Sequence, residues 1–216
     1  MAPRLDQTAL PGKLRVTEEV GDHNAGRDDP RSDVRRRDRG KEEPWVVDFM
    51  KQAPYGFLAT VGEEGQPFLN SNLFVYDEER HCIYLHTHRT GRTRDNLDRG
   101  QKVAFSVAAI GRLLPAPEAL EFSVEYAGVV AFGVGRVVED VSEAKAALQR
   151  LLDKYAPHLA PGDDYRPTTD EELKRTAVYR VDVETWSGKQ KEADADFPGA
   201  YALPELPVPF PERSTE

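Results

Sequence analysis

Three short runs of the chain are rich in apolar and aromatic residues and are bounded by turn-forming segments, which is typical of strands. They cover residues 55–61, 66–76 and 81–87, and the turn-forming segments 62–65 and 77–80 separate them. Strands joined by turns this short usually pair with their neighbours in the chain. The pattern therefore predicts an antiparallel meander of three strands.

Three further runs, 102–109, 129–139 and 177–185, also predict strands. The first is almost continuously apolar, which favours burial on both of its faces. The second contains Gly133 and Gly135, which indicate a bend or a bulge. The third alternates and is typical of a half-exposed strand. We expect the segment 111–117, which begins with Gly111 and contains Pro115 and Pro117, to be a loop.

Four segments have helical periodicity or a helix-start signal: 44–52, 92–98, 142–155 and 169–175. In the longest, Ala144, Leu148 and Leu151 share one face. Thr169 and Glu172 have the spacing of a capping box. Because six or seven strands follow one another without alternating with long helices, we expect a mainly β, α+β fold. An antiparallel barrel with peripheral helices fits better than a doubly wound parallel sheet.

Charge divides the 216 residues into a folded domain, 43–195, with an N-terminal arm, 1–42, and a Pro-rich tail, 196–216. Residues 1–43 hold ten basic and ten acidic side chains, so the rest of the chain carries the whole net charge of −9. An acidic domain argues against binding nucleic acid through its phosphates. The basic run 33–39 leaves a nucleic-acid-binding arm open, but a solvated segment offset by nearby acids is favoured.

Cysteine count and hydropathy limit the location of the protein. Cys82 is the only cysteine, which excludes an intrachain disulfide framework and a zinc site of the CxxC kind. No apolar run reaches the roughly 18 residues of a membrane-spanning helix. The N-terminus lacks the apolar core of a signal peptide. We therefore expect a cytoplasmic protein without a membrane partner.

Common catalytic motifs are missing from the sequence. It has no GxGxxG after a strand, no Walker loop, no GxSxG and no HExxH, which weakens the Rossmann, NTPase, hydrolase and zinc-protease interpretations. His81, His86 and His88 could contribute to a metal site, but no acidic third ligand is fixed near them. Histidines that line a ligand or satisfy hydrogen bonds are favoured, and no metal is expected.

The segment 87–100 is the strongest candidate for binding an anion. Thr87 offers a hydroxyl at a strand end, Gly91 lets the backbone approach a ligand, and Arg92 offers a bidentate fork. Arg94 is a second cation close by, and together these groups could hold a phosphate. The alternative is a solvated helix face whose arginines pair with nearby aspartates.

Several segments, in this order and spacing, resemble the pyridoxamine 5'-phosphate oxidase-like flavoproteins, most closely the nitroimidazole-resistance branch. The segments are 57–61, 66–76, 83–96, 123–126, 133–137, 173–179 and the TrpSerGlyLys sequence of 186–189. The resemblance implies a split β-barrel that forms a homodimer with FMN at the subunit interface. It also shows two departures: Thr93 stands where many members have lysine, and Gly128 where many have serine.

The resemblance also implies which residues form the site. Beside the flavin ring it places Asn70, Ser71, Asn72, Leu73 and Ser106, and at the phosphate Thr87, Gly91 and Arg92 with help from Arg94. Trp186 and Lys189 would lie near the cofactor, although a tryptophan at a strand end is more often packed in a core. His86 would be the catalytic residue that handles a proton.

Four functions remain open on the sequence. The favoured one is an FMN-dependent oxidoreductase that reduces a small nitro-aromatic compound such as a 5-nitroimidazole. The second is a flavin- or haem-binding module without that turnover, with His86 or His88 as a haem ligand. Oxidation of pyridoxamine phosphate is weaker, because the tail lacks that enzyme's C-terminal substrate segment. A nucleic-acid-binding regulator is the fourth.

Overall fold

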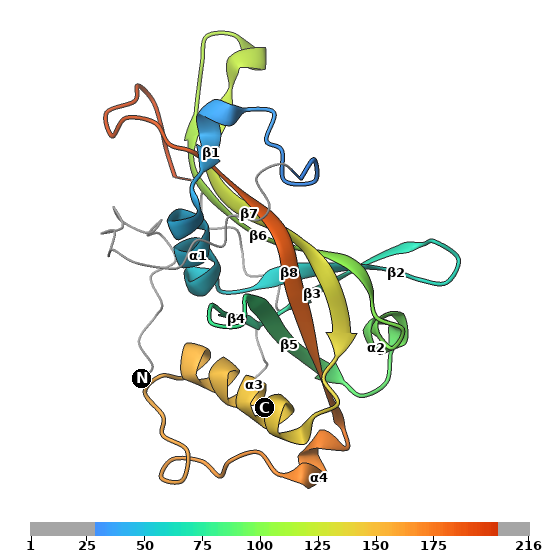
Figure 1. Ribbon diagram of the computed structural model, residues 1–216. Coiled ribbons are helices and arrows are strands. Elements are labelled where there is room, and N and C mark those ends of the chain that lie inside the picture. The colour runs from blue at the N-terminus through green and yellow to red at the C-terminus, as the bar shows by residue number, and fades with distance from the viewer. Residues whose placement is uncertain (1–28, 203–216) are drawn as a thin grey trace, which may run out of the picture.

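The computed structural model describes residues 29–202 (Figure 1). The predicted N-terminal arm and Pro-rich tail therefore fall partly outside the described residues. The described part of the arm lies against the barrel, because Arg31 forms an ion pair with Glu184 at 2.7 Å. No described helix is long and apolar enough to cross a membrane.

A single antiparallel sheet of eight strands forms the body of the described chain. The strands are β1 (Gly40–Lys41), β2 (Gly56–Val61), β3 (Pro67–Asn72), β4 (Phe74–Asp77), β5 (Cys82–His88), β6 (Gln101–Leu114), β7 (Ser123–Val137) and β8 (Thr176–Lys191). Their order is β3-β2-β6-β7-β8-β5-β4, with β1 added to β8. Only Leu73 separates β3 from β4, so the two ends of this path meet and close the sheet into a barrel. The expected mainly β antiparallel barrel is confirmed.

The two antiparallel pairings of the predicted meander are confirmed, but the single strand 66–76 is wrong. β3 pairs with β2 and β4 pairs with β5, but β3 and β4 do not pair with each other. The strand breaks at Leu73 because its two halves join opposite ends of the sheet path. The Tyr155 hydroxyl holds this break: it accepts from the Phe74 backbone N–H at 3.1 Å and lies 3.0 Å from the Phe74 carbonyl oxygen.

β6 differs from its prediction in two ways. It is not buried on both faces: Val103, Phe105 and Val107 are buried, whereas Ala108 and Ile110 point outward and are exposed. Nor do residues 111–114 form a loop, because Leu113 and Leu114 pair with β7. The expectation failed because small alanines make the strand look uniformly apolar although only every second side chain enters the core.

β7 and β8 are also longer than predicted. β7 begins at Ser123 and β8 continues to Lys191, so the TrpSerGlyLys sequence lies within a strand. The expected bulge is confirmed, because the β7–β8 register shifts between Phe132 and Gly133. There the sheet passes so close to Gly133 that an added Cβ would lie 2.0 Å from the Asp182 carbonyl oxygen.

We expect Gly133→Ala to lower the free energy of unfolding by roughly 1–3 kcal/mol, the usual cost of overpacking. The obstructing atom belongs to the backbone, so no side-chain rotation relieves the clash. Urea unfolding measures the change. Gly128→Ala is the matched control, because its Cβ would meet the nearest backbone atom at 3.2 Å. Equal stability of the two variants would contradict the bulge geometry.

The helices lie on the outside of the barrel and at its ends (Figure 1). They are α1 (Glu43–Gln52), α2 (Arg92–Leu97), α3 (Val141–Tyr155) and α4 (Asp170–Leu173), with short 3-10 turns η1 (Arg37–Arg39) and η2 (Ala119–Glu121). α1 adds Val46, Phe49 and Met50 to the barrel core. α3 packs Ala144 and Ala147 into a second cluster with Tyr84 and Val178 on the outer face of the sheet. The capping box predicted at Thr169 is confirmed.

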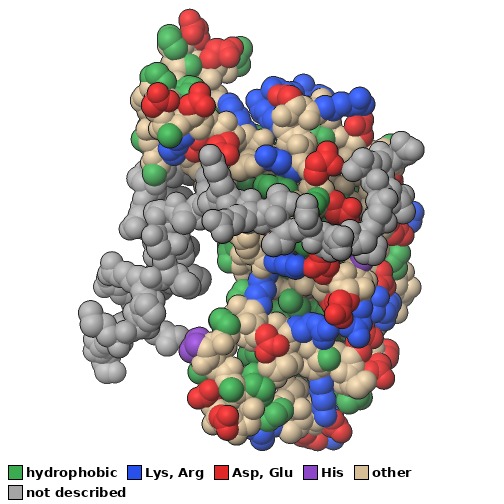
Figure 2. All heavy atoms as spheres, turned by 60° about the vertical axis from the view of Figure 1, so that its left-hand side comes forward, with side chains coloured by type: hydrophobic (Ala, Val, Ile, Leu, Met, Phe, Trp, Pro, Cys, Tyr) green, Lys and Arg blue, Asp and Glu red, His purple; other side chains and the backbone are tan. Residues whose placement is uncertain are grey.

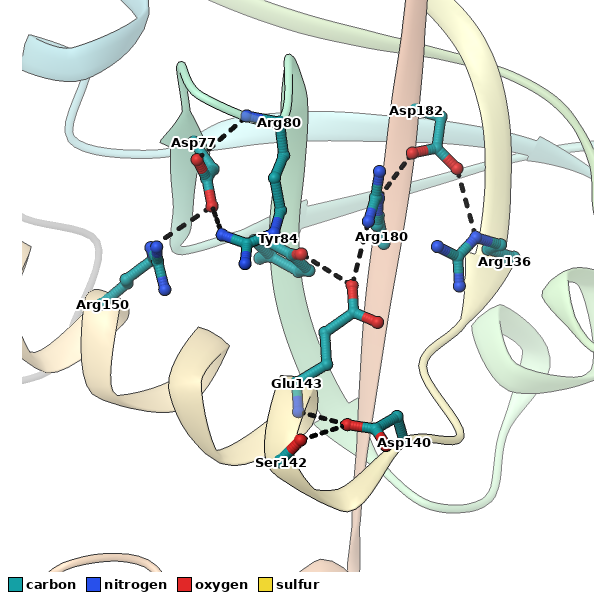
Figure 3. Close-up of polar contacts among 10 residues, drawn as sticks. All are labelled: Asp77, Arg80, Tyr84, Arg136, Asp140, Ser142, Glu143, Arg150, Arg180 and Asp182. Atoms are coloured by element: carbon teal, nitrogen blue, oxygen red, sulfur yellow. Dashed lines mark hydrogen bonds and ion pairs between the residues drawn. The ribbon is translucent and has the colours of Figure 1, made fainter.

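A chain of charged groups fastens α3 to β5 and β8 (Figure 3). Glu143 accepts from the Tyr84 hydroxyl at 2.7 Å and from Arg180 at 3.1 Å, and Arg180 continues to Asp182. Burial opposes the charge on Glu143, but the hydrogen bonds from Tyr84 and Arg180 outweigh it and lower the pKa of its carboxyl. Asp140 caps the helix by accepting from the Glu143 N–H at 2.7 Å. α3 is thereby oriented over β5 and β8.

Lys154 lies at the end of the barrel, beside the break at Leu73. Its Nζ is buried without a hydrogen-bond partner, the one such side-chain atom among residues 29–202, and it lies 3.9 Å from the centre of the Phe74 ring. Burial lowers the pKa of Lys154 to about 8. The unfolded chain therefore holds this proton between pH 8 and 10.5 where the folded chain does not.

We expect Lys154→Met to stabilise the fold at pH 7 by roughly 1–3 kcal/mol, because it removes a buried unsatisfied donor and keeps the apolar stem. The gain should shrink as the pH rises from about 8 towards 10.5, where the wild-type lysine is neutral in both states. Urea unfolding at pH 7 and pH 10 measures it. Lys145→Met, on the exposed side of α3, should show no such pH dependence.

Candidate functional site

The predicted site residues fall into two groups at opposite ends of β8. Thr87 pairs with Ala177 near the start of that strand, whereas Trp186 and Lys189 lie near its end. At about 3.3 Å per residue, roughly 30 Å of strand separates Ala177 from Trp186. One chain therefore does not bring the two groups together.

Arg92 is the most available cation at the Thr87 end. Its guanidinium lies 5.0 Å over the Phe68 ring, and no described acidic side chain pairs with it. The neighbouring arginines are occupied: Arg94 binds Asp98 at 2.6 Å and also Glu139, and Arg99 binds Glu63 at 2.7 Å. Arg89 donates to the Leu173 carbonyl oxygen. Arg92 is thus free to bind an anion, whereas Arg94 would first have to leave its carboxylates.

Gly91 and Thr87 shape the space around Arg92. Gly91 has φ 130°, a conformation that favours glycine. A Cβ added at this position would have no other atom within 4 Å, so the turn is open. The Thr87 hydroxyl donates to the His88 carbonyl oxygen or bonds to the Tyr179 hydroxyl, both at 2.9 Å. A guanidinium, two hydroxyls and an open backbone turn therefore lie at the end of β5. No local sequence signal points to Tyr179 or Phe68, because their contacts with this site depend on strand pairing.

The residues 70–73 divide between the two faces of β3. Asn70 points inward, and its amide donates to the Thr93 hydroxyl at 3.1 Å, which ties β3 to α2. Asn72 donates to the Asn70 carbonyl oxygen at 3.0 Å. Ser71 and Leu73 alternate with them and lie exposed on the outer face. Thr93 is thus a buried support of the turn.

The outer face of the sheet continues from Ser71 to Ser106. Ser71 is directly opposite Phe57, and Phe57 is opposite Ser106, so the three side chains share a row. The Ser106 hydroxyl donates to the Val129 carbonyl oxygen at 3.2 Å. Large exposed apolar side chains lie along this face: Tyr55, Phe57, Leu69, Leu73 and Ile110. A flat apolar ligand or a protein surface could cover them.

His86 lies on the other face of β5. Successive residues of a strand alternate, so Thr87 shares the inner face with Leu85, whereas His86 shares the α3 face with Tyr84. The side chain of His86 is exposed, yet the protein atoms round its ring displace part of its hydration and lower its pKa. The ring is therefore neutral at pH 7. The proton-handling role stays a prediction, and the sheet separates His86 from Thr87.

Trp186 is packed in an aromatic cluster at the other end of β8. Its ring lies 4.6 Å from that of His81 and 5.3 Å from that of Tyr76. His81 has φ 47°, which an L-residue rarely adopts, and its Nδ1 is 2.8 Å from the Tyr76 hydroxyl. A cavity of about 260 Å³ opens beside this cluster. Lys189 is exposed three residues further along β8 and does not line this cavity.

No group of three or more His, Cys, Asp or Glu side chains within residues 29–202 could hold a metal ion. Cys82 is buried, which raises the pKa of its thiol to about 11. The thiol is therefore protonated at pH 7 and unsuited to nucleophilic chemistry.

Solved structures with the same fold include three bacterial proteins. A flavocytochrome from Azotobacter vinelandii is 20% identical with a TM-score of 0.68, covering 87% of this chain and 90% of its own. An FAD and haem binding protein from Mycobacterium smegmatis is 22% identical with a TM-score of 0.66, covering 82% and 93%. A proposed 5-nitroimidazole antibiotic resistance protein from Bacteroides thetaiotaomicron is 22% identical with a TM-score of 0.57, covering 70% and 86%.

Sequence comparison gives the family directly. No curated protein matches the chain significantly. Residues 42–190, which include every strand from β2 to β7 and nearly all of β8, match the pyridoxamine 5'-phosphate oxidase family. The chain belongs to the pyridoxamine 5'-phosphate oxidase family.

Proposed function

We propose that the protein binds FMN between two copies of the chain and acts as an oxidoreductase. The observation that carries this proposal is the exposed Arg92 guanidinium, which has no described acidic partner and stands beside the open turn at Gly91. A phosphate monoester matches its fork of donors. The Thr87 hydroxyl adds a neutral donor at the same end of β5.

The second copy supplies what one chain lacks. Trp186 lies roughly 30 Å and Lys189 roughly 40 Å along β8 from the phosphate end, farther than one flavin ring system reaches. A two-fold arrangement brings the Trp186 end of one copy to the Thr87 end of the other. Such an interface would also cover the exposed side chains of Phe57, Leu69 and Ile110.

The chain's own residues fit the remaining parts of FMN. Ser71 and Ser106 present hydroxyls on the outer face, and Leu73 presents apolar surface for a flat ring. Asn70 orients the strand through Thr93 and does not face that side. FMN would supply the electron transfer, while these residues hold its ring and phosphate.

A small nitro-aromatic compound such as a 5-nitroimidazole is the substrate that the resemblance supports best. The fold shared with a proposed 5-nitroimidazole antibiotic resistance protein favours the same class of substrate. The test is to follow a 5-nitroimidazole with the purified, FMN-loaded protein and a chemical reductant. We expect loss of the nitro absorbance in proportion to protein. Unchanged nitroimidazole with bound FMN would contradict the substrate and leave the cofactor proposal standing.

Haem binding is the second candidate, and His86 favours it. His86 is neutral at pH 7 and has no hydrogen bond to a described residue, so it could serve as an axial ligand. The His88 Nδ1 instead accepts from the Thr90 N–H at 3.2 Å. Two proteins of the same fold are a flavocytochrome and an FAD and haem binding protein.

If haem binds, His86→Ala should abolish the Soret band and leave flavin bound, because His86 lies on the opposite sheet face from Thr87. Absorption spectra of haem-titrated protein measure this. His88→Ala is the control and should keep the band. A Soret band that survives in His86→Ala would exclude His86 as the ligand.

A further inference from the structure

A second cavity, of about 460 Å³, lies where α1, β4 and the C-terminal end of α3 meet. Figure 1 shows these elements on the left of the barrel, and Figure 2 turns that side towards the viewer, where acidic and basic side chains lie next to one another. Val75 and Tyr76 of β4 contribute apolar surface to the cavity, and Lys154 of α3 lines it as well. None of these residues is among those proposed to hold FMN.

The amine of Lys154 lies at this cavity without a hydrogen bond. Its Nζ is buried and has no hydrogen-bond partner among the described residues. Its close neighbours are aromatic rings, with the centre of Phe74 at 3.9 Å and that of Tyr155 at 5.2 Å. Buried polar atoms without a partner are uncommon, and a chemical role is one of their explanations. Because no hydrogen bond fixes the amine, rotation of the flexible stem can turn it from the Phe74 ring into the cavity.

The protonation state of Lys154 suits a nucleophile. Its pKa of about 8, lowered by burial, leaves about a tenth of the amine neutral at pH 7. An exposed lysine, with a pKa of about 10.4, is less than about 0.1% neutral at that pH. Only the neutral amine has the lone pair that attacks an electrophile, and desolvation in an apolar pocket is a common way to activate a lysine.

The charges around the cavity limit which ligands enter it. Both cations that line it besides Lys154 are paired, Lys51 with Glu78 at 2.5 Å and Arg150 with Asp77 at 3.3 Å. Carboxylates outnumber these cations, because two more acidic side chains line the cavity, Glu79 and Asp153. The excess negative charge repels anionic ligands and admits uncharged ones.

We propose that Lys154 is a covalent binding site for small uncharged aldehydes, which enter this cavity and form an imine with its Nζ. The neutral amine attacks the carbonyl carbon, and one N–H proton passes to the carbonyl oxygen to give a carbinolamine. The second N–H proton then leaves with the hydroxyl group as water, and a C=N bond remains. The step needs no oxidant or reductant, and addition of water reverses it. This binding does not depend on flavin.

Reductive trapping tests the site. The folded protein is incubated with butanal and cyanoborohydride at pH 7, which converts each imine into a stable secondary amine, and peptide mass spectrometry measures the rate at every lysine. We expect Lys154 to react at least about tenfold faster than two controls. Lys145 lies on the same helix and pairs with Asp170, and Lys102 is exposed. A rate at Lys154 equal to or below that of both controls would overturn the proposal.

The pH and the fold give two further readouts. The ratio of the Lys154 rate to the Lys102 rate should fall as the pH rises from 7 towards 10, because Lys102 then gains neutral amine whereas Lys154 is already neutral. In protein unfolded by urea the two lysines should react alike. A ratio that stays constant with pH, or that survives unfolding, would overturn the role of the buried amine.

Succinic semialdehyde tests the class of ligand, because it adds a carboxylate to the four-carbon chain of butanal. We expect the ratio of the Lys154 rate to the Lys102 rate to be at least about threefold lower with this anionic aldehyde, since the carboxylates at the cavity repel it. The same ratio with both aldehydes would overturn the preference for uncharged ligands.

Discussion

Replacing Arg92 by alanine should weaken FMN binding roughly tenfold to a hundredfold. A charge-assisted hydrogen bond typically contributes about 1.5–3 kcal/mol, and no other arginine of the turn is free of a partner to replace it. The fold should not change, because Arg92 is exposed and its side chain forms no ion pair with a described acidic residue. Quenching of FMN fluorescence during titration measures the dissociation constant.

Arg99→Ala is the control for this effect. Arg99 lies in the same basic stretch but binds Glu63 at 2.7 Å. Its loss should leave the dissociation constant for FMN within about twofold of the wild-type value, because a distant exposed charge is screened by salt. If both variants weaken FMN equally, the effect is one of general charge and Arg92 is no phosphate ligand.

Removal of the Glu125 carboxylate should lower the free energy of unfolding by about 3 kcal/mol. Removing one partner of a buried ion pair typically costs about 3–5 kcal/mol, and the lower end applies because the Arg112 side chain keeps 28% exposure. Glu125→Ala also leaves the N–H groups of Arg112 and Ala193 without their acceptor. Urea unfolding at pH 7 measures the loss. A change below about 1 kcal/mol would show that this ion pair does not stabilise the β6–β7 hairpin.

The same pair predicts a dependence on pH. Hydrogen bonds from Arg112 lower the pKa of Glu125 to about 2, below the unfolded value of 4.5. A lowered carboxyl pKa contributes stability above 4.5 that is lost as the pH falls from 4.5 towards 2. The difference in stability between wild type and Glu125→Ala should therefore shrink between pH 5 and pH 3, whereas a difference that stays constant would contradict the role of the charge.

The sequence identified most elements and the antiparallel pairings of β2 with β3 and of β4 with β5, but not the other strand pairings. Apolar runs bounded by turn residues located β2 and β5, alternation located β8, and helical periodicity located α1 and α3, because these patterns depend on local sequence alone. The break at Leu73 has no local signal, since it arises from β3 and β4 joining opposite ends of the sheet path. Small side chains concealed the alternation of β6, and the reach of β8 to Lys191 depends on its pairing with β7 and β1.

For the site, residue chemistry pointed to the turn around Arg92, and the structure leaves that guanidinium available. It could not separate Arg92 from Arg94, because Glu139 lies far away in sequence and reaches Arg94 only through the fold. The family resemblance placed His86 and Thr87 at one flavin site, although their side chains leave opposite faces of β5. The distance between the Thr87 and Trp186 groups also became visible only once the register of β8 was known.

The most direct test of the account is a titration of the purified protein with FMN, with riboflavin as the phosphate-free comparison. Saturation at one FMN per subunit of a dimer, with riboflavin at least about tenfold weaker, is the predicted result, because Arg92 would hold the phosphate. Equal affinity for FMN and riboflavin would contradict the role of the Arg92 turn. No binding of either would contradict the proposed function.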